Sequence, residues 1–581
     1  MYIETVPNRN SRPTILLRQG TRQGNKVIKR TLANLTHWPK HKVETFRRLL
    51  QDEPLAPPNT LFRIEQSLPH GAVEAVLGTM RRIGFDTLIA AKSSTKRRLV
   101  MAMVAEQLLH HSSKLGSTRL WHTTTLAEQL GVHEANEDDL YQAMDWLLAQ
   151  QSRIETKLAK RHLSPGDHVL YDVSSSYYEG HTCALACFGY NRDQKRGTTS
   201  IVYGVMTDAE GRPIALEVYP GNTADPTTVP KQVDKLRKRF GLQHVVLVGD
   251  RGTLTQTQIT TLKTYPGLGW ISALRFEAIR KLADANSFPA ALFEPPYLAQ
   301  MTSESFPDER LMACFNTQLA AQRKRKRQEL LACTETDLDK IAKEVARRTK
   351  TPFKPAQIGQ KVGSVLHRYK MGKHFRVSID ETGFRYERRT DSIERERDLD
   401  GIYVIRTSEP EARVSAADAV RGYKALAQVE RVFRTLKGLD IRVRPIRHRL
   451  DRRVRAHIFL CLLAYYVEWH MRRALAPVLF DDEDLAENRP HRDPVAPARP
   501  STSAQQKKWH RVTPEGLPIQ SFETLLAALA TRCQNRCRLL CDPEAPPFYL
   551  MTDLSALQQR AFELLGLVFP VTGTSDPIAS E

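Results

Sequence analysis

The sequence predicts an α/β fold: a mixed sheet with helices packed on it, preceded by a helical region and interrupted by an inserted α+β domain. Short apolar runs alternate with helical spacing between residues 164 and 275. Residues 244–249 are continuously apolar, as expected of a strand buried on both faces. Residues 251–429, 179 in number, separate two candidate site acids, whereas a strand and its helix need only about 40. The excess predicts the inserted domain.

Two regions precede the predicted sheet. Residues 1–60 are polar and basic, and residues 18–30 have the pattern of a hairpin around a Gly-containing turn. Such a hairpin could contact DNA phosphates or serve only as a charged surface. Residues 61–163 follow helical spacing, and residues 123–131 carry a helix start and a Gly stop, as in a helix-turn-helix motif. We therefore predict a helical domain that is a candidate for DNA binding, although ordinary bundles contain the same pattern.

The sheet itself is predicted in two parts, residues 164–275 and 411–478. The elements of the first part are a strand at 168–174, strands within 199–221, a helix near 227–239 and strands at 244–249 and 268–273. This order fits a mixed sheet whose first strands are linked by hairpins and whose later strand returns through a helix.

The inserted domain is predicted at residues 276–410. Its first part is helical to about Arg348 and contains the basic run Arg323-Lys324-Arg325-Lys326-Arg327, and its second part, 360–407, alternates as strands do. A basic run is often only a solvated helix face. Five consecutive cations in a protein of formal charge +21 favour phosphate contact, with Arg323, Lys324 and Arg325 as candidates.

Beyond the sheet, residues 479–510 are polar and Pro-containing, which predicts a linker, and 511–570 look helical. Residues 571–581 are expected to be a disordered tail. Cys533, Cys537 and Cys541 would share one helical face and could bind zinc, but a buried stripe of small apolar thiols is the favoured interpretation because no CxxC pair is present.

Composition restricts the partners. The chain has 86 Lys and Arg against 65 Asp and Glu and a pI near 9.6, which suits a polyanion such as nucleic acid. The longest clearly apolar patch, 458–467, is shorter than the roughly 20 residues needed to cross a bilayer. The first residues do not resemble a secretory signal, and the eight cysteines suit reduced thiols. We expect a cytoplasmic protein with no membrane contact.

Three acids stand in unusual contexts. Asp172 lies in the middle of a predicted strand, and Asp250 directly follows the apolar run 244–249, at the strand end where ligands collect in open α/β sheets. On a helical wheel of residues 422–437, Tyr423, Glu430, Arg434 and Lys437 form one polar stripe beside an apolar sector. The helix can then pack on the sheet with Glu430 facing both aspartates. Taken singly, each acid would be read as an ordinary surface carboxylate.

Convergence of these acids would have a chemical consequence. Three carboxylates in a partly dry site repel one another unless cations neutralise them. Sites rich in oxygen and poor in His favour Mg²⁺ or Mn²⁺ over zinc. Two such ions about 3.5–4 Å apart can activate a water or a 3′-hydroxyl and stabilise the leaving oxygen of a phosphodiester.

At these residues the sequence resembles the DDE transposases of bacterial insertion sequences. The spacing of Tyr423, Glu430 and Lys437 is similar to the Y-(R)-E-K signature of the group whose core carries a β-rich insertion, with Leu426 where that signature has Arg. The segments 219–225, 248–252 and 455–458 also resemble the family, and the likeness runs from about residue 165 to 470.

The resemblance implies an RNase H-like core and a transposase that binds the terminal inverted repeats of its element, cleaves a strand and joins the 3′-hydroxyl to target DNA. Asp172, Asp250 and Glu430 would be the catalytic, metal-binding residues, with Mg²⁺ or substituting Mn²⁺. The resemblance also implies a homodimer on DNA in the bacterial cytoplasm, associated with the nucleoid when DNA is bound. Expected DNA contacts are Tyr423, Arg434 and Lys437, together with Arg444 and Arg447 beside the acids. A nuclease without strand transfer and an inactive DNA-binding remnant are the alternatives.

Overall fold

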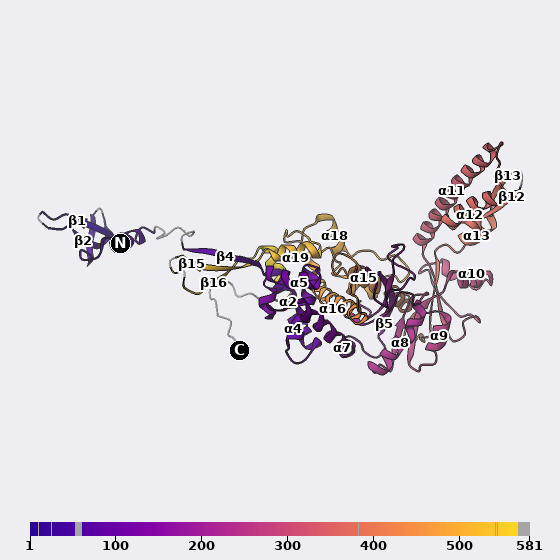
Figure 1. Ribbon diagram of the computed structural model, residues 1–581, viewed down its shortest axis with the longest axis horizontal. Coiled ribbons are helices and arrows are strands. Elements are labelled where there is room, and N and C mark those ends of the chain that lie inside the picture. Colours follow the sequence, from indigo (N-terminus) through magenta and orange to yellow (C-terminus); the bar gives the residue numbers. More distant parts are fainter. Residues whose placement is uncertain are drawn as a thin grey trace. The chain divides into compact units, whose positions relative to one another are not determined.

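The computed structural model describes residues 1–9, 11–24, 26–52, 61–380, 383–540, 542 and 544–567 (Figure 1). The chain forms two compact units. The first contains residues 1–71 and 530–554, and the second contains residues 72–529 and the segment that starts at residue 555.

The first unit contains two three-stranded antiparallel sheets. One is built from β1 (Tyr2–Val6), β2 (Thr14–Gln23) and β3 (Lys26–Asn34), followed by α1 (Lys40–Leu49). The hairpin predicted at residues 18–30 is confirmed, because β2 and β3 pair antiparallel with Gln23 opposite Lys26. The other sheet joins β4 (Phe62–Pro69) to β15 (Cys533–Leu539) and β16 (Phe548–Met551), which come from the far end of the sequence.

The predicted helix through Cys533 and Cys537 is wrong. Both residues lie on strand β15, which pairs with β4, and Cys541 lies outside the described residues. A strand needs a pairing partner, and this partner is more than 460 residues away, as the contact between Arg538 and Glu65 shows. The remaining helices near the C-terminus are α19 (Phe522–Ala530) and α20 (Ala556–Leu564). Residues 571–581, predicted to be a disordered tail, also lie outside the described residues.

The second unit is built on an eight-stranded sheet of order β10-β11-β14-β9-β8-β5-β6-β7. Its strands are β5 (His168–Tyr177), β6 (Ser200–Thr207), β7 (Pro213–Pro220), β8 (Val245–Val248), β9 (Leu268–Ala273), β10 (Leu298–Met301), β11 (Arg310–Phe315) and β14 (Ile402–Thr407). Strands β5, β6 and β7 form an antiparallel meander, and β8 and β9 follow parallel to β5. This is the RNase H-like arrangement, and all five predicted core strands are present.

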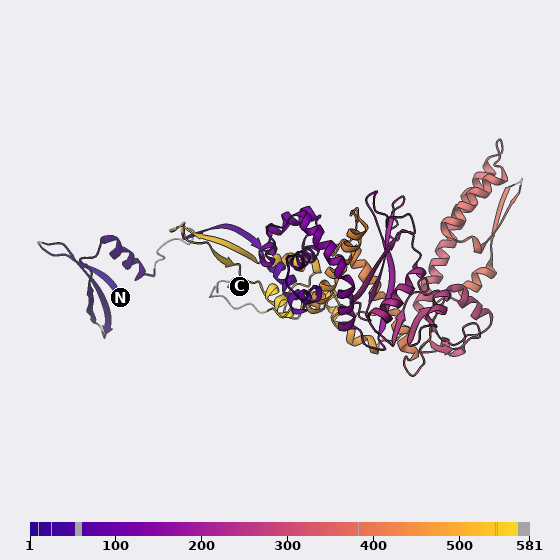
Figure 2. The ribbon, with the colours of Figure 1, turned by 60° about the horizontal axis from the view of Figure 1, so that its bottom comes forward.

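The predicted insertion does not form a wholly separate domain. Its strand β14 pairs antiparallel with β9, and β11 and β10 follow outward in turn, so the three strands extend the core sheet. Helix α10 (Phe276–Asp284) packs on these strands. The part that leaves the sheet consists of α11 (Thr317–Arg347), α12 (Pro355–Tyr369), β12 (Phe375–Asp380), β13 (Gly383–Arg388) and α13 (Thr390–Arg397), and both views show α11 beside the β12–β13 hairpin (Figures 1 and 2).

Strands were predicted throughout 360–407, and this is wrong for α12 and α13. Residues Ile358, Val362 and Val365 recur at helical spacing, which puts them on one face of α12. They share a core with Leu331 and Leu338 of α11. The helical period of these apolar residues therefore outweighs the local alternation.

A helical layer covers the sheet. The region predicted to be helical contains α2 (Gly71–Arg82), α3 (Phe85–Ile89), α4 (Thr95–Leu109), α5 (Lys114–Leu120), α6 (Leu126–Leu130) and α7 (Glu137–His162). Helix α16 (Asp451–Leu475) packs against α4 and α7, and its apolar stretch 458–467 is fully buried there. Within the described parts of the chain, no helix has the length and apolar character required to cross a membrane.

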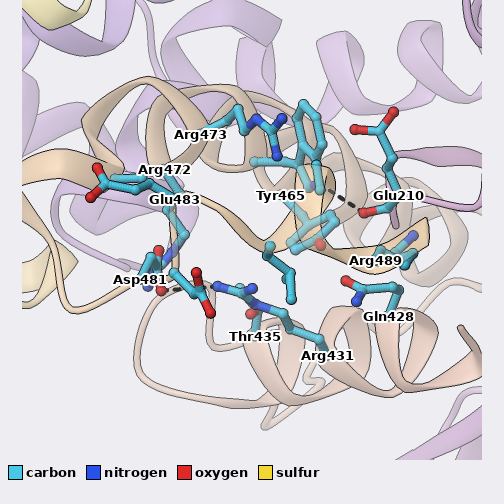
Figure 3. Close-up of a pocket in the computed structure, with 15 residues that line it drawn as sticks. Glu210, Gln428, Arg431, Thr435, Tyr465, Arg472, Arg473, Asp481, Glu483 and Arg489 are labelled. Carbon is cyan, nitrogen blue, oxygen red and sulfur yellow. Dashed lines mark hydrogen bonds and ion pairs between the residues drawn. The ribbon is translucent and has the colours of Figure 1, made fainter. Parts of the chain in front are cut away.

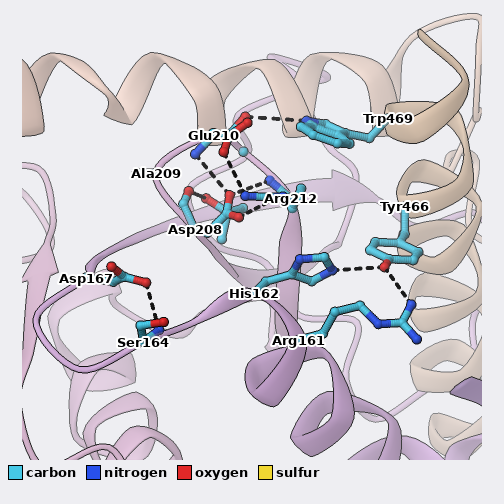
Figure 4. Close-up of polar contacts among 12 residues, drawn as sticks. Arg161, His162, Ser164, Asp167, Asp208, Ala209, Glu210, Arg212, Tyr466 and Trp469 are labelled. Carbon is cyan, nitrogen blue, oxygen red and sulfur yellow. Dashed lines mark hydrogen bonds and ion pairs between the residues drawn. The ribbon is translucent and has the colours of Figure 1, made fainter. Parts of the chain in front are cut away.

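Polar contacts join α7, α16 and the turn between β6 and β7 (Figure 4). The Tyr466 hydroxyl lies 2.9 Å from His162 Nε2 and accepts a hydrogen bond from Arg161. Arg212 binds Asp208 within the turn, and the Trp469 indole donates to the Glu210 carbonyl at 3.4 Å. These contacts orient α16, and with it the core sheet, relative to the helical layer.

Candidate active site

Asp172 lies on β5, and Asp250 lies two residues beyond the end of the neighbouring strand β8. The parallel pairing of β5 with β8 puts Leu170 opposite Val248, and the same register two residues further puts Asp172 opposite Asp250. Adjacent strands are about 4.8 Å apart. The apolar pattern of the sequence predicted the strand that carries Asp172 and the strand that Asp250 follows. The pairing register of these strands brings the two acids together.

Both carboxylates are held by backbone groups. Oδ1 of Asp172 accepts the N–H of Val173 at 2.7 Å, and Oδ1 of Asp250 accepts the N–H groups of Gly252 and Thr253 at 3.0 and 2.6 Å. Burial raises the pKa of Asp172 to about 7, with the charge of Asp250 acting in the same direction. A carboxyl group in such a place holds its proton unless a positive charge comes near.

Glu430 approaches from the helical side. The predicted single helix is divided at Ala425 into α14 (Ala416–Lys424) and α15 (Leu426–Lys437). Helix α15 packs over β5 and β6, where the rings of Phe433 and Tyr203 lie 5.9 Å apart. At the preceding Gly422, a Cβ atom would meet the His168 ring at 3.0 Å, so α14 lies close to β5. Glu430 itself is exposed.

Tyr423 lies among all three acids. Burial, followed by the negative charges of Asp250, Glu430 and Asp172, raises the pKa of Tyr423 to about 12, with Arg251 opposing the shift. The structure thus brings the three predicted acids into one neighbourhood.

The acids do not form a closed ligand set. Within the described residues, no group of three His, Cys, Asp or Glu side chains is arranged to hold a metal ion. Backbone donors engage Asp250, and three like charges repel one another. The chemistry of the donors nevertheless fits a hard divalent cation, since all three are carboxylates and burial favours neutralisation of Asp172.

Lys437 and Arg444, predicted to contact DNA, both point inward. Lys437 Nζ donates to the Ser175 carbonyl at 2.6 Å and pairs with Asp193 at 3.1 Å, and Arg444 also pairs with Asp193. The Asp193 side chain is only 3% exposed, and it accepts the N–H of Tyr177 at 3.0 Å. Burial opposes ionisation of Asp193, but Lys437 and Arg444 outweigh it and hold the pKa below its usual value. We call these three charged residues the Asp193 clamp.

A comparison with known protein families identifies the group to which the chain belongs. A family model described as "Transposase DDE domain" matches residues 164–467, more than half of the chain. The chain belongs to this transposase family. No curated protein matches. A solved structure, described as the piggyBac transposase synaptic complex with hairpin DNA, is similar with a TM-score of 0.35 and 10% identity over 87% of this chain and 84% of that one. A likeness that low carries no argument here.

The side chains of the other residues predicted to contact DNA in this transposase differ in their exposure to solvent. Arg434 is exposed, one helical turn from Glu430. Arg447 is also exposed, and pairs with Glu179 at 3.1 Å. Lys324 and Arg325 on α11 face solvent, whereas Arg323 is half-buried and points to the carbonyls of Leu399 and Ile402. The basic run is therefore not a uniform surface.

Sequence reasoning missed one ion pair near the acids. Arg192 pairs with Asp225 at 2.5 Å, and the Arg192 N–H donates to Ser175 Oγ on β5 at 3.1 Å. The charges of both Arg192 and Asp225 act on Asp172. Arg192 and Asp225 lie 33 positions apart, so no local pattern indicates the pair. The only sequence signal was the place of Asp225 in the segment 219–225.

A separate polar cavity of about 80 Å³ lies on the side of α15 turned away from Glu430 (Figure 3). Gln428, Arg431 and Thr435 line it from α15. Arg431 binds Asp481 at 3.0 Å, and Arg472 binds both Asp481 and Asp440. Internal acids thus neutralise Arg431 and Arg472, and the residues that line the cavity do not include Asp172, Asp250 or Glu430.

Proposed function

We propose that this transposase binds the ends of a bacterial insertion sequence, cleaves DNA there by metal-assisted hydrolysis and joins the freed 3′-hydroxyl to target DNA. The observation that carries the proposal is the level pair Asp172 and Asp250 beside the helix of Glu430, within a transposase DDE domain. We further propose that the protein acts as a homodimer on DNA, because two ends must be processed together, and that it works in the cytoplasm.

The three acids would hold the metal ions. Mg²⁺, or Mn²⁺ in its place, would supply activation of the attacking oxygen and neutralisation of charge on the phosphate. Asp172 and Asp250 project from one sheet edge, and Glu430 would complete the set by a small movement of α15 or of its own side chain. Tyr423, half-buried and within reach of the charges of all three acids, would contact the bound strand. Arg434, exposed on the same helix, would hold a phosphate.

Two other functions use the same residues. A nuclease would cleave DNA and stop there, and an inactive remnant would bind DNA without cleavage. Intact acids at all three positions favour an active enzyme over the remnant. Joined products would exclude the simple nuclease.

The test is cleavage and joining of labelled DNA that contains the element ends, with Mg²⁺ or Mn²⁺. The variants Asp172→Asn, Asp250→Asn and Glu430→Gln remove a charge and keep the side-chain shape. Each should lower the cleavage rate more than about 100-fold. Loss of a residue that only supports a metal ligand usually lowers activity by about 10- to 100-fold, so a larger loss indicates a ligand. Glu277→Gln is the matched control, because Glu277 is an exposed helical acid of the same unit.

Metal binding gives a second readout. Electron paramagnetic resonance of Mn²⁺ titrated into the protein should show weaker binding in each site variant and unchanged binding in Glu277→Gln. Full cleavage by any one site variant would remove that residue from the mechanism. Cleavage without joined products would leave the nuclease as the function.

A further inference from the structure

Strands β2 and β3 form a ribbon whose outer half has no helix or further strand packed on it, and only the Tyr2 ring of β1 lies beside it, near Gly20 and Lys29 (Figure 2). From Gln19 to Gln23 on β2, and from Lys26 to Leu32 on β3, every residue is exposed. The inner half of β2 is partly covered instead. An exposed ribbon that adds nothing to a core requires another explanation for its side chains.

Helix α1 packs only at the base of this sheet. Arg47 of α1 donates to Thr5 of β1 at 3.4 Å, and the two buried apolar residues of this region are Leu35 and Val43. Glu4 pairs at the base with Arg18 and Lys29. Glu4 is the one acidic residue on these three strands, and these two cations neutralise it. Its charge therefore does not offset the other cations of the ribbon.

The region is strongly basic. Residues 1–52 contain eleven Lys and Arg against three Asp and Glu, a difference of eight positive charges. Besides Lys29, which pairs with Glu4, the outer half of the ribbon carries Arg22, Lys26 and Arg30 and no acid. This charge suits a polyanion.

The neutral side chains of the ribbon make the inference specific. Gln19 and Gln23 are exposed on β2, and Val27 and Ile28 are 59% and 52% exposed on β3. Phosphate contact makes no use of the apolar groups and does not require Gln, since Lys and Arg suffice for it. Readout of bases uses all of them, because Gln pairs with adenine, Arg and Lys pair with guanine, and apolar groups contact the methyl group of thymine.

The shape fits the same partner. The major groove of B-DNA admits a two-stranded β-ribbon. We propose that the β2–β3 ribbon enters the major groove of duplex DNA and reads base edges through Gln19, Gln23 and Arg30, which lie on one face because Arg30 pairs directly opposite Gln19. This inference rests on the proposed function, in which the transposase selects its element ends, and it names the surface that makes the selection.

The test uses the full-length protein and a library of random DNA duplexes. Selection by binding and sequencing should enrich one motif, which then serves as the probe against a scrambled duplex in fluorescence anisotropy. Enrichment of no motif would overturn the proposal.

The first variant, Gln19→Ala with Gln23→Ala, removes no charge. It should lower the preference for the motif over the scrambled duplex at least tenfold and leave the salt dependence unchanged, since each bidentate contact contributes about 1–3 kcal/mol of discrimination. Arg30→Ala, on the same face, should lower the same preference and also reduce the salt dependence. The control Lys42→Ala removes an exposed cation of α1 and should leave the preference unchanged.

A second measurement tests the groove. Replacing guanine by 7-deazaguanine in the motif removes an acceptor from the major groove and keeps base pairing. It should weaken binding of the wild type and have little further effect on Arg30→Ala. Circular dichroism melting of each variant verifies that it is folded, as expected because the altered residues are exposed.

The outcomes separate this inference from the proposed function. Unchanged preference in both ribbon variants, or an equal loss for both duplexes, overturns base readout by the ribbon, and DNA cleavage that depends on Asp172 would still stand. Lost preference together with cleavage that survives Asp172→Asn would support the ribbon and reject the proposed catalytic site.

Discussion

Within the basic run of α11, the position of each cation on the helix decides its role. Arg327 is buried and binds both oxygens of Asp400, with a distance of 2.9 Å for one of the two contacts. Arg325, two positions earlier, faces solvent and pairs only with Glu329 at 3.6 Å. The composition of the run predicts charge, but only the packing of the helix decides which cations remain available for DNA.

Arg327→Ala should destabilise the protein far more than Arg325→Ala. Removing Arg327 leaves the Asp400 carboxylate buried without its partner, which costs about 3–5 kcal/mol. Removing Arg325 from the surface should cost less than about 0.5 kcal/mol. Thermal melting followed by circular dichroism measures both. Similar melting temperatures for the two variants would contradict the buried pair.

Glu468 of α16 gives stability a pH dependence. Its side chain is fully buried, and burial raises the pKa of Glu468 to about 7. Arg472 lowers this pKa only in part, because it is shared with Asp440 and Asp481. The folded protein therefore keeps a proton on Glu468 that the unfolded chain releases above about pH 4.5. The contribution of this group to the free energy of unfolding falls as the pH rises from about 4.5 to 7.

Glu468→Gln should remove this dependence. The amide keeps an acceptor for Arg472 and carries no charge at any pH. The melting temperature of the variant minus that of the wild type should thus increase from pH 5 to pH 8. A difference that is constant or decreases over this range would show that Glu468 is ionised in the folded protein at neutral pH.

These residues show how far the sequence alone can predict a site. Apolar runs predicted the strands of Asp172 and Asp250, and a helical wheel predicted the stripe of Glu430. The register that sets the two aspartates level is a property of strand pairing, so it could not be read locally. Lys437 was predicted to contact DNA from its place in the same stripe, and its inward partner, Asp193, lies 244 positions away, where local patterns do not reveal it.

At the scale of elements, the Asp193 clamp fixes the end of α15 to β5. Lys437 stands seven residues, or about 10 Å along the helix, from Glu430. Strand β5 carries Asp172 and, near its end, the Ser175 and Tyr177 backbone groups that the clamp engages. The clamp therefore controls the distance between Glu430 and the aspartates.

Asp193→Asn should move α15 without removing any site residue. The amide cannot neutralise both Lys437 and Arg444, so their repulsion loosens the helix end. We expect a higher Mn²⁺ concentration for half-maximal cleavage and unchanged DNA affinity. If Asp193 only stabilises the fold, the melting temperature would fall and the metal dependence would stay the same.

Arg434 should behave as a phosphate contact, in contrast to Lys437. Arg434 is exposed, so Arg434→Ala should weaken DNA binding evenly across sequences and lower the slope of log affinity against log salt by about 0.9. Lys437→Met should leave that slope unchanged, because its ammonium group binds Ser175 and Asp193. Anisotropy titrations at several salt concentrations distinguish the two. A reduced slope for Lys437→Met would mean that DNA displaces Asp193 from it.

At the scale of the whole molecule, the insertion has two parts with different structural roles. Strands β10, β11 and β14 extend the sheet, and β14 leads directly into α14 and the helix of Glu430. The part from α11 to α13 has its own apolar core, which includes Leu338, Val362 and Phe384. Its two ends meet at the sheet, where the Asn316 N–H donates to the Gly401 carbonyl at 2.9 Å.

This closure predicts that the outer part can be removed and the inner part cannot. Replacing residues 317–400 by a short Gly-Ser turn should preserve the sheet, because Phe315 already pairs with Ile402 and the buried pair of Arg327 and Asp400 leaves together. The shortened protein should melt cooperatively and bind Mn²⁺, with weaker DNA binding because the exposed cations of α11 are gone. Removing all of 276–410 takes β14 from beside β9 and should abolish folding. If the two deletions have the same effect, the outer part belongs to the core and this division of the insertion is wrong.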